Sequence, residues 1–184
     1  MGPRFVTFAA LFYGSLTAAA ILWAVLRGFE LRLSGDSVAL SLALGALTPV
    51  VTVSLGLLAY RLLPVLREVA EELAPRLVDG ASGGSLILIS VFSGVGEEAF
   101  FRGVVQQEFG LVVASVAFGV VHVGPDRRYL WWTAWAVLAG FLFGSLYEAT
   151  GGLLAPILAH AAHNAATLLL WRRSRKVVSA HDPG

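Results

Sequence analysis

Three charged side chains stand inside an apolar run of the sequence. Glu97, Glu98 and Arg102 occur in SGVGEEAFFRGVV, directly after the apolar segment GGSLILISVF. A charged side chain at the centre of a bilayer costs at least about 2.5–3.5 kcal/mol on insertion scales, so such residues are usually paired or functional. Glu98 and Arg102 are four residues apart and can form an ion pair on one helix face. Glu97 is turned about 100° away from Glu98, so it can face another helix and act as a general base.

Two further pairs have the same four-residue spacing. Phe118 and His122 share a helix face in AFGVVH, and His160 and Asn164 share one in AHAAHN. An imidazole can move a proton or donate a hydrogen bond, and an asparagine amide offers two N–H donors. The chain contains no cysteine, so thiol catalysis is excluded.

An ion-pair cluster that serves only packing is the simpler interpretation of the two glutamates and the arginine. That interpretation leaves one carboxylate without a basic partner in its own helix. A single histidine in an apolar helix is also more often a hydrogen-bonded core residue than a catalyst. Histidines on other apolar segments, together with two glutamates, favour a shared functional site.

The elements that must position these residues are membrane helices. The chain has 184 residues, of which 57% are hydrophobic and 14% charged, whereas soluble domains are about 25% charged. The composition therefore predicts an all-α, polytopic membrane bundle that forms a single domain over residues 1–184. Because a helical span needs about 20 apolar residues, six spans are predicted, at 5–26, 37–60, 84–108, 110–123, 129–148 and 153–171. Residues 61–79 predict an amphipathic interfacial helix, and residues 172–184 a polar C-terminal tail.

Helix geometry predicts that the polar residues lie at similar depth. At a rise of 1.5 Å per residue, Glu97 lies about 20 Å from the start of its span, which leaves about 10 Å to the other face of a core about 30 Å thick. His160 lies about 10 Å from that face, and His122 about 17 Å. The three residues are therefore expected to meet.

The positions of lysine and arginine predict the orientation. Six spans place both termini on one side, and that side carries ten Lys and Arg residues, against Arg27 and Arg32 on the other. Because cytoplasmic loops are enriched in these residues, we expect cytoplasmic termini in a cell (inner) membrane. The net charge of +1 gives no reason to expect a nucleic-acid partner.

The motifs resemble those of the CPBP family, the CAAX protease and bacteriocin-processing proteins, also called ABI proteins. EEAFFR from Glu97 resembles the family's EExxxR motif, FGVVH from Phe118 its FxxxH motif, and HAAHN from His160 its HxxxN motif. GFLFG at 140–144 stands where the family has a helix of small residues. The resemblance covers roughly residues 83–171, with all three motifs in order on apolar segments.

The resemblance implies an intramembrane glutamic endopeptidase similar to type II CAAX prenyl proteases. Glu97 would activate water, His122 would assist it, and His160 and Asn164 would form an oxyanion hole. Phe118 and the neighbouring Glu–Arg pair would support the site, with that pair holding the first glutamate in place. The implied partners are membrane lipids and a membrane-associated protein or peptide substrate, such as a lipidated CAAX-like tail, a tail-anchored sorting signal of the myxosortase type, or a peptide precursor. No cofactor is implied.

Three alternatives stay open. A zinc protease could use Glu97, His122 and His160 or His163, although the sequence lacks HExxH and asparagine is an unusual zinc ligand. His163 is otherwise expected to be a packing residue or to support the site indirectly. A non-enzymatic immunity or scaffold protein could use the same polar residues to bind a partner. A small-solute or proton transporter could use them as a relay.

Overall fold

A computed structural model describes residues 3–181, and every regular element in that range is helical. Seven α-helices and one π-helical segment follow one another along the chain. They are α1 Pro3–Arg27, α2 Val38–Leu62, α3 Pro64–Val78, α4 Gly83–Phe100, the π-helical segment η1 Phe101–Val105, α5 Gln106–Val120, α6 Tyr129–Thr150 and α7 Leu154–His181. The all-α bundle predicted from composition is confirmed.

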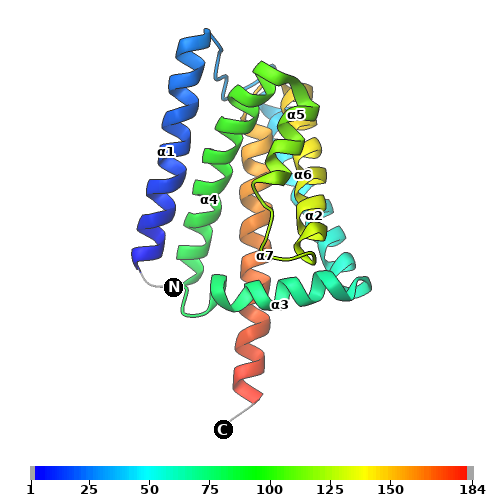
Figure 1. The fold of residues 1–184 in the computed structure, drawn as a ribbon. Coiled ribbons are helices and arrows are strands. Elements are labelled where there is room, and N and C mark those ends of the chain that lie inside the picture. Colours follow the sequence, from blue (N-terminus) through cyan, green and yellow to red (C-terminus); the bar gives the residue numbers. More distant parts are fainter. Residues whose placement is uncertain (1–2, 182–184) are drawn as a thin grey trace.

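The helices pack around α7. This helix contacts both α2 and α4, while α1 packs against α4 and α5 packs against α6. α1 therefore forms one edge of the bundle, and α2 and α6 lie on the opposite side of α7 (Figure 1). Both ends of the described chain lie at the same end of the bundle, as an even number of crossings requires (Figure 1).

The outer surface of the bundle is apolar, as lipid contact requires. Leu11, Leu22 and Leu138 expose 67%, 60% and 64% of their surface. So many exposed apolar side chains are rare on soluble monomers, and they fit a surface that faces lipid. Four segments are long and apolar enough to span a membrane: Arg4–Arg27, Val38–Leu62, Gly83–Val120 and Tyr129–Thr150. The protein is thus a multi-pass membrane protein.

The segment Gly83–Val120 contains two of the predicted spans, because the chain turns back at Gly110. This residue has φ 82° and ψ 169°, a backbone conformation that is essentially restricted to glycine. α7 is not among the four candidate segments, and three polar residues of its apolar half, His160, His163 and Asn164, lower its hydropathy. Six crossings therefore stay a prediction.

α3 lies across the end of the bundle at which the chain begins and ends (Figure 1). Pro64 occupies its first turn, where the missing N–H costs no hydrogen bond. Val69, Ala70 and Val78 are buried against the bundle, while charged residues cover the other face. This arrangement fits a helix at the membrane surface, so the interfacial location of the predicted helix 61–79 stays a prediction.

Three predicted boundaries differ from the structure. The third span is interrupted by η1, in which the N–H of Gln106 bonds to Phe101 O, so one residue is added to a helical turn. α5 ends at Val120 instead of residue 123, so His122 lies in the turn that follows, ahead of Pro125. α7 does not end at residue 171 but continues to His181.

Candidate active site

A buried ion pair joins the last turn of α4 to η1. Arg102 Nη1 donates to Glu98 Oε1 at 3.2 Å, and Arg102 Nε lies 3.1 Å from Oε2. Glu98 and Arg102 expose 0% and 1% of their surface, so the pair is shielded from lipid and solvent alike. The predicted ion pair is present, and such a buried pair has to be satisfied by further donors and acceptors.

α7 and α6 supply those further partners. His160 Nδ1 donates to Glu98 Oε1 at 2.7 Å, and Arg102 Nη2 donates to Gly140 O at 3.0 Å. The Arg102 guanidinium carbon also lies 4.6 Å from the centre of the Phe118 ring and 5.7 Å from that of Phe143, within the range of cation–π attraction. The pair therefore fixes α4 to α6 and α7 and orients the His160 ring.

The direct contacts of Glu98 and Arg102 thus differ from those that the family resemblance implied. Glu98 binds His160 directly and Arg102 binds Glu98, whereas Arg102 and Glu97 interact only at longer range through their charges. The helix angle between adjacent residues explains the difference, because Glu98 faces α7 while Glu97 faces away from it.

Glu97 faces His122. Glu97 Oε2 lies 3.8 Å from His122 Nε2, and Glu97 is 8% exposed. His122 Nδ1 lies 2.6 Å from Phe118 O. Because a carbonyl oxygen only accepts hydrogen bonds, Nδ1 carries a proton, and in the neutral form of the ring Nε2 presents its lone pair to Glu97. In that form two proton acceptors face each other across a gap too wide for a direct hydrogen bond.

The turn that carries His122 is tied to the surface helix α3. Arg128 Nη2 donates to Glu72 Oε2 at 3.0 Å, and Tyr129 Oη donates to Glu72 Oε1 at 3.2 Å. Arg128 also binds Asp126 within the turn, and its guanidinium holds the pKa of that carboxyl below its ordinary value. α3 therefore helps to fix the turn that places His122.

Asn164 and His163 point to different neighbours. Asn164 Nδ2 donates to Ser93 Oγ of α4 at 3.0 Å, one turn before Glu97. His163 Nδ1 lies 2.9 Å from Thr52 Oγ1 of α2, so His163 is directed away from α4. Of the predicted residues on α7, His160 and Asn164 thus face α4 together, while His163 does not.

Sequence reasoning missed two residues that contact the site. Ser93 lies four residues before Glu97, so helix periodicity could have placed it on the same face. Tyr13 of α1 lies within electrostatic range of Glu97, and no spacing relates it to the motifs. In the part of the chain that the structure describes, no three His, Cys, Asp or Glu side chains are grouped so that they could hold a metal ion.

The fold and the site define a multi-pass helical membrane protein with an acid–imidazole cluster inside its bundle. A family model described as "Type II CAAX prenyl endopeptidase Rce1-like" matches residues 81–166, slightly less than half of the chain. The matched segment contains all three motifs, so the family predicted from them is confirmed. It runs from just before α4 into α7 and leaves α1, α2 and α3 outside.

One curated protein that the chain resembles is itself functionally undescribed. "Uncharacterized protein YpbD" of Bacillus subtilis (strain 168) is 40% identical over 75 residues, which cover 41% of this chain and 39% of that protein. The alignment thus spans less than half of either chain. No solved structure matches the chain significantly.

Proposed function

We propose that this protein is an intramembrane endopeptidase of the glutamic type, which hydrolyses a peptide bond in a membrane-associated substrate. The observation that carries the proposal is the pair of facing acceptors, Glu97 Oε2 and His122 Nε2, 3.8 Å apart. A water molecule that donates one hydrogen to each of them would be oriented and made more nucleophilic.

In the proposed reaction Glu97 takes a proton from this water as its oxygen attacks the scissile carbonyl carbon. The carbon becomes tetrahedral and its oxygen negatively charged. The proton then passes to the amide nitrogen, directly or through His122, and the C–N bond breaks to give a carboxylic acid, which loses its proton to the released amine. Glu97 returns to its ionised form.

The proposed oxyanion hole is formed by His160 and Asn164. One donor of each residue is already used, His160 Nδ1 by Glu98 and one Asn164 amide hydrogen by Ser93. His160 Nε2, when it carries a proton, and the second amide hydrogen of Asn164 are left for the substrate. The contacts on the other side of each residue orient these donors before substrate binds, which is what electrostatic stabilisation requires.

The proposed substrate is a protein or peptide tail that reaches the site from the membrane. The matched family is one of CAAX prenyl endopeptidases, which supports a lipidated C-terminal tail as the first substrate class to test. A tail-anchored sorting signal of the myxosortase type is the second, because the site lies inside an apolar bundle that a membrane-embedded segment can approach. The proposal places the protein in the cell membrane with cytoplasmic termini.

Cleavage by purified protein in liposomes tests this proposal. The probes are an internally quenched peptide with a farnesylated CAAX tail and an exported tail-anchored reporter. We expect cleavage of at least one probe, and a loss of roughly 10²–10⁴-fold in Glu97→Gln, since this is the contribution of a positioned general base. Glu97→Gln has nearly the same shape as the parent residue, so its melting temperature serves as the control for folding.

The alternatives predict other results. Activity that survives a strong zinc chelator and extensive dialysis argues for the glutamic mechanism, whereas a loss that added zinc restores argues for a metalloprotease. Cleavage by Glu97→Gln at the wild-type rate would rule out the proposed base. Failure of wild-type protein to cleave either probe would favour a binding role for the cluster.

A further inference from the structure

The turn between α5 and α6 carries His122, and contacts from α6 hold it. His122 N donates to Gly119 O at 2.9 Å, and Thr133 Oγ1 donates to His122 O at 3.5 Å. A side-chain carbon at Gly124 would collide with the ring of Tyr129, so this ring lies directly against the turn. The position of His122 therefore depends on where the first residues of α6 are held.

A single carboxylate of α3 binds those first residues twice. Tyr129 Oη donates to Glu72 Oε1 at 3.2 Å, and Arg128 Nη2 donates to Glu72 Oε2 at 3.0 Å. Tyr129 is 4% exposed, so its contact with the carboxylate is shielded. Arg76 also donates to Glu72, at 3.4 Å, but from within α3, and Glu68 Oε2 lies farther from the turn, 4.0 Å from Arg128 Nη1. Glu72 is thus the main link between α3 and the turn.

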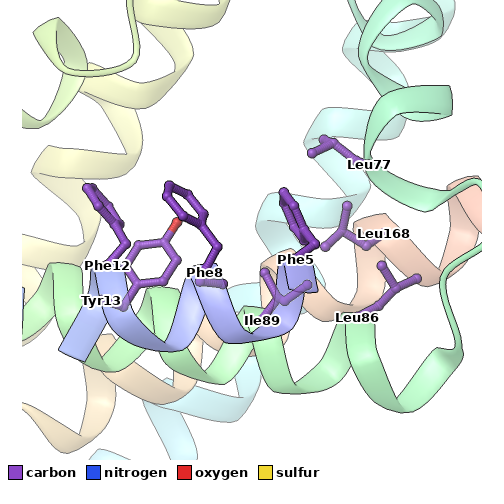
Figure 2. A pocket seen from close by; sticks show the side chains of 9 residues that line it. Phe5, Phe8, Phe12, Tyr13, Leu77, Leu86, Ile89 and Leu168 are labelled. Carbon is purple, nitrogen blue, oxygen red and sulfur yellow. The ribbon is translucent and has the colours of Figure 1, made fainter. Parts of the chain in front are cut away.

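Apolar packing around α3 is incomplete, which increases the weight of this link. Leu77 of α3 borders a cavity of about 260 Å³, and Figure 2 shows it there with Phe5 of α1 and Leu168 of α7. Leu66 and Ala70 of α3 border a second cavity, of about 340 Å³. Residues next to a void lose van der Waals contacts on that side. Polar contacts therefore contribute more to the position of α3 than they would on a fully packed surface.

We propose that Glu72 is a positioning residue for His122, and that it acts through Tyr129 and Arg128. The proposal rests on the proposed function of Glu97 and His122. Glu97 Oε2 and His122 Nε2 lie 3.8 Å apart, and orienting one water between them requires that this distance be kept. α3 lies outside the matched segment 81–166, yet a displacement of α3 would move one of the two groups that orient the water.

Hydrogen–deuterium exchange of the protein in liposomes tests the attachment without any substrate. Glu72→Met removes both acceptor oxygens and keeps an unbranched side chain. We expect the amides of residues 121–128 to exchange about fivefold faster in this variant, because the loss of a hydrogen bond favours local opening by about this factor.

Glu71→Met is the matched control on the same helix. Glu71 also accepts from a tyrosine, Tyr60 Oη at 2.8 Å, but Tyr60 belongs to α2. This substitution therefore releases α3 from a different neighbour and should leave exchange in residues 121–128 at the wild-type rate. Exchange there that is unchanged in Glu72→Met, or equally fast in both variants, would overturn the proposal.

Cleavage kinetics test whether the attachment matters for the reaction. In Glu72→Met we expect kcat to fall about tenfold with KM unchanged, because a displacement of about 1 Å can cost a catalytic group about 10²-fold in rate. Glu71→Met should match wild type in both constants. A fall in kcat of the same size in both variants would show a general effect of loosening α3 and refute the positioning role.

A double-mutant cycle tests the route through His122. If Glu72 acts through this imidazole, adding Glu72→Met to His122→Gln should lower the residual activity much less than it lowers that of wild type. The same factor in both backgrounds would refute the positioning role. If wild-type protein cleaves neither probe, the proposed function fails, and the exchange rates then decide whether Glu72 holds the turn.

Discussion

Arg102→Met tests whether the buried guanidinium holds the site together. The substitution keeps an unbranched side chain in the same space but removes the positive charge. Glu98 then loses the hydrogen bond from Nη1 at 3.2 Å and the nearby charge of Nε at 3.1 Å, and Gly140 O loses its donor at 3.0 Å. His160 still donates to Glu98, so the carboxylate is not left entirely without a partner.

The structure sets the size of the effect. Removal of one partner of a buried ion pair costs roughly 3–5 kcal/mol, because an uncompensated charge stays buried. The remaining His160 contact places Arg102→Met at the lower end, at about 3 kcal/mol. A chain of this size loses about 2–4 °C in melting temperature per kcal/mol, so a decrease of about 6–12 °C is expected.

Tryptophan fluorescence during heating in detergent measures this decrease, and two further variants interpret it. Arg76→Met removes an ion pair with the same i, i+4 spacing, to Glu72, but 67% of the Arg76 side chain is exposed. Its melting temperature should change by no more than about 4 °C, because exposed pairs contribute only about 0–1 kcal/mol. Glu98→Gln combined with Arg102→Met removes both buried charges and should melt above Arg102→Met alone.

Two results would refute the reasoning. If Arg102→Met melts within the range of Arg76→Met, the buried pair does not fix α4 to its neighbours. If Glu98→Gln combined with Arg102→Met is no more stable than Arg102→Met alone, the loss does not come from an uncompensated carboxylate.

Two further predictions concern packing and pH. Gly96→Ala should destabilise the protein by about 1–3 kcal/mol through overpacking against Tyr13. Gly14→Ala, with nothing within 4 Å of the added carbon, should be neutral or stabilising. Equal melting temperatures of the two variants would contradict the packing argument. Hydrogen bonds from Arg175 lower the pKa of Asp79 below its ordinary 3.8, so this contact stabilises the end of α7 above that pH and is lost as the pH falls through the lower value. Asp79→Asn should therefore speed hydrogen exchange in the last turns of α7 at neutral pH but not in strong acid, and equal effects at both would exclude an ionic contact.

Most of the helices could be predicted because four segments are long and apolar enough to span a bilayer and end near charged or glycine-rich residues. The close approach of the motifs could also be predicted, since a fixed rise per residue places Glu97, His122 and His160 at similar depth. The structure brings His122 to Glu97 and His160 to Glu98. Sequence spacing thus indicates which residues share a helix face and which lie at similar depth in the membrane.

Spacing did not show which neighbour each face meets. The resemblance assigned Glu98 and Arg102 to the support of Glu97, but their direct contacts run to His160 and α6 because of how α4 is rotated in the bundle. The π-helical turn Phe101–Val105 depends on the same packing, and no residue pattern in FFRGVV indicates it. Tyr13 was missed because no motif or spacing in the sequence links this tyrosine to the other site residues.

The two adjacent glutamates have partners on different elements, and these partners determine what each glutamate does in the bundle. The partners of Glu98 come from η1, α6 and α7, and His160, Arg102 and Gly140 all lie within residues 81–166. Glu97 faces His122 inside that segment, and Tyr13, outside it, lies within electrostatic range. Because adjacent helix residues point about 100° apart, one glutamate cannot take over the contacts of the other. Glu98 therefore stabilises the bundle in which the site lies, while Glu97 faces the turn that carries His122.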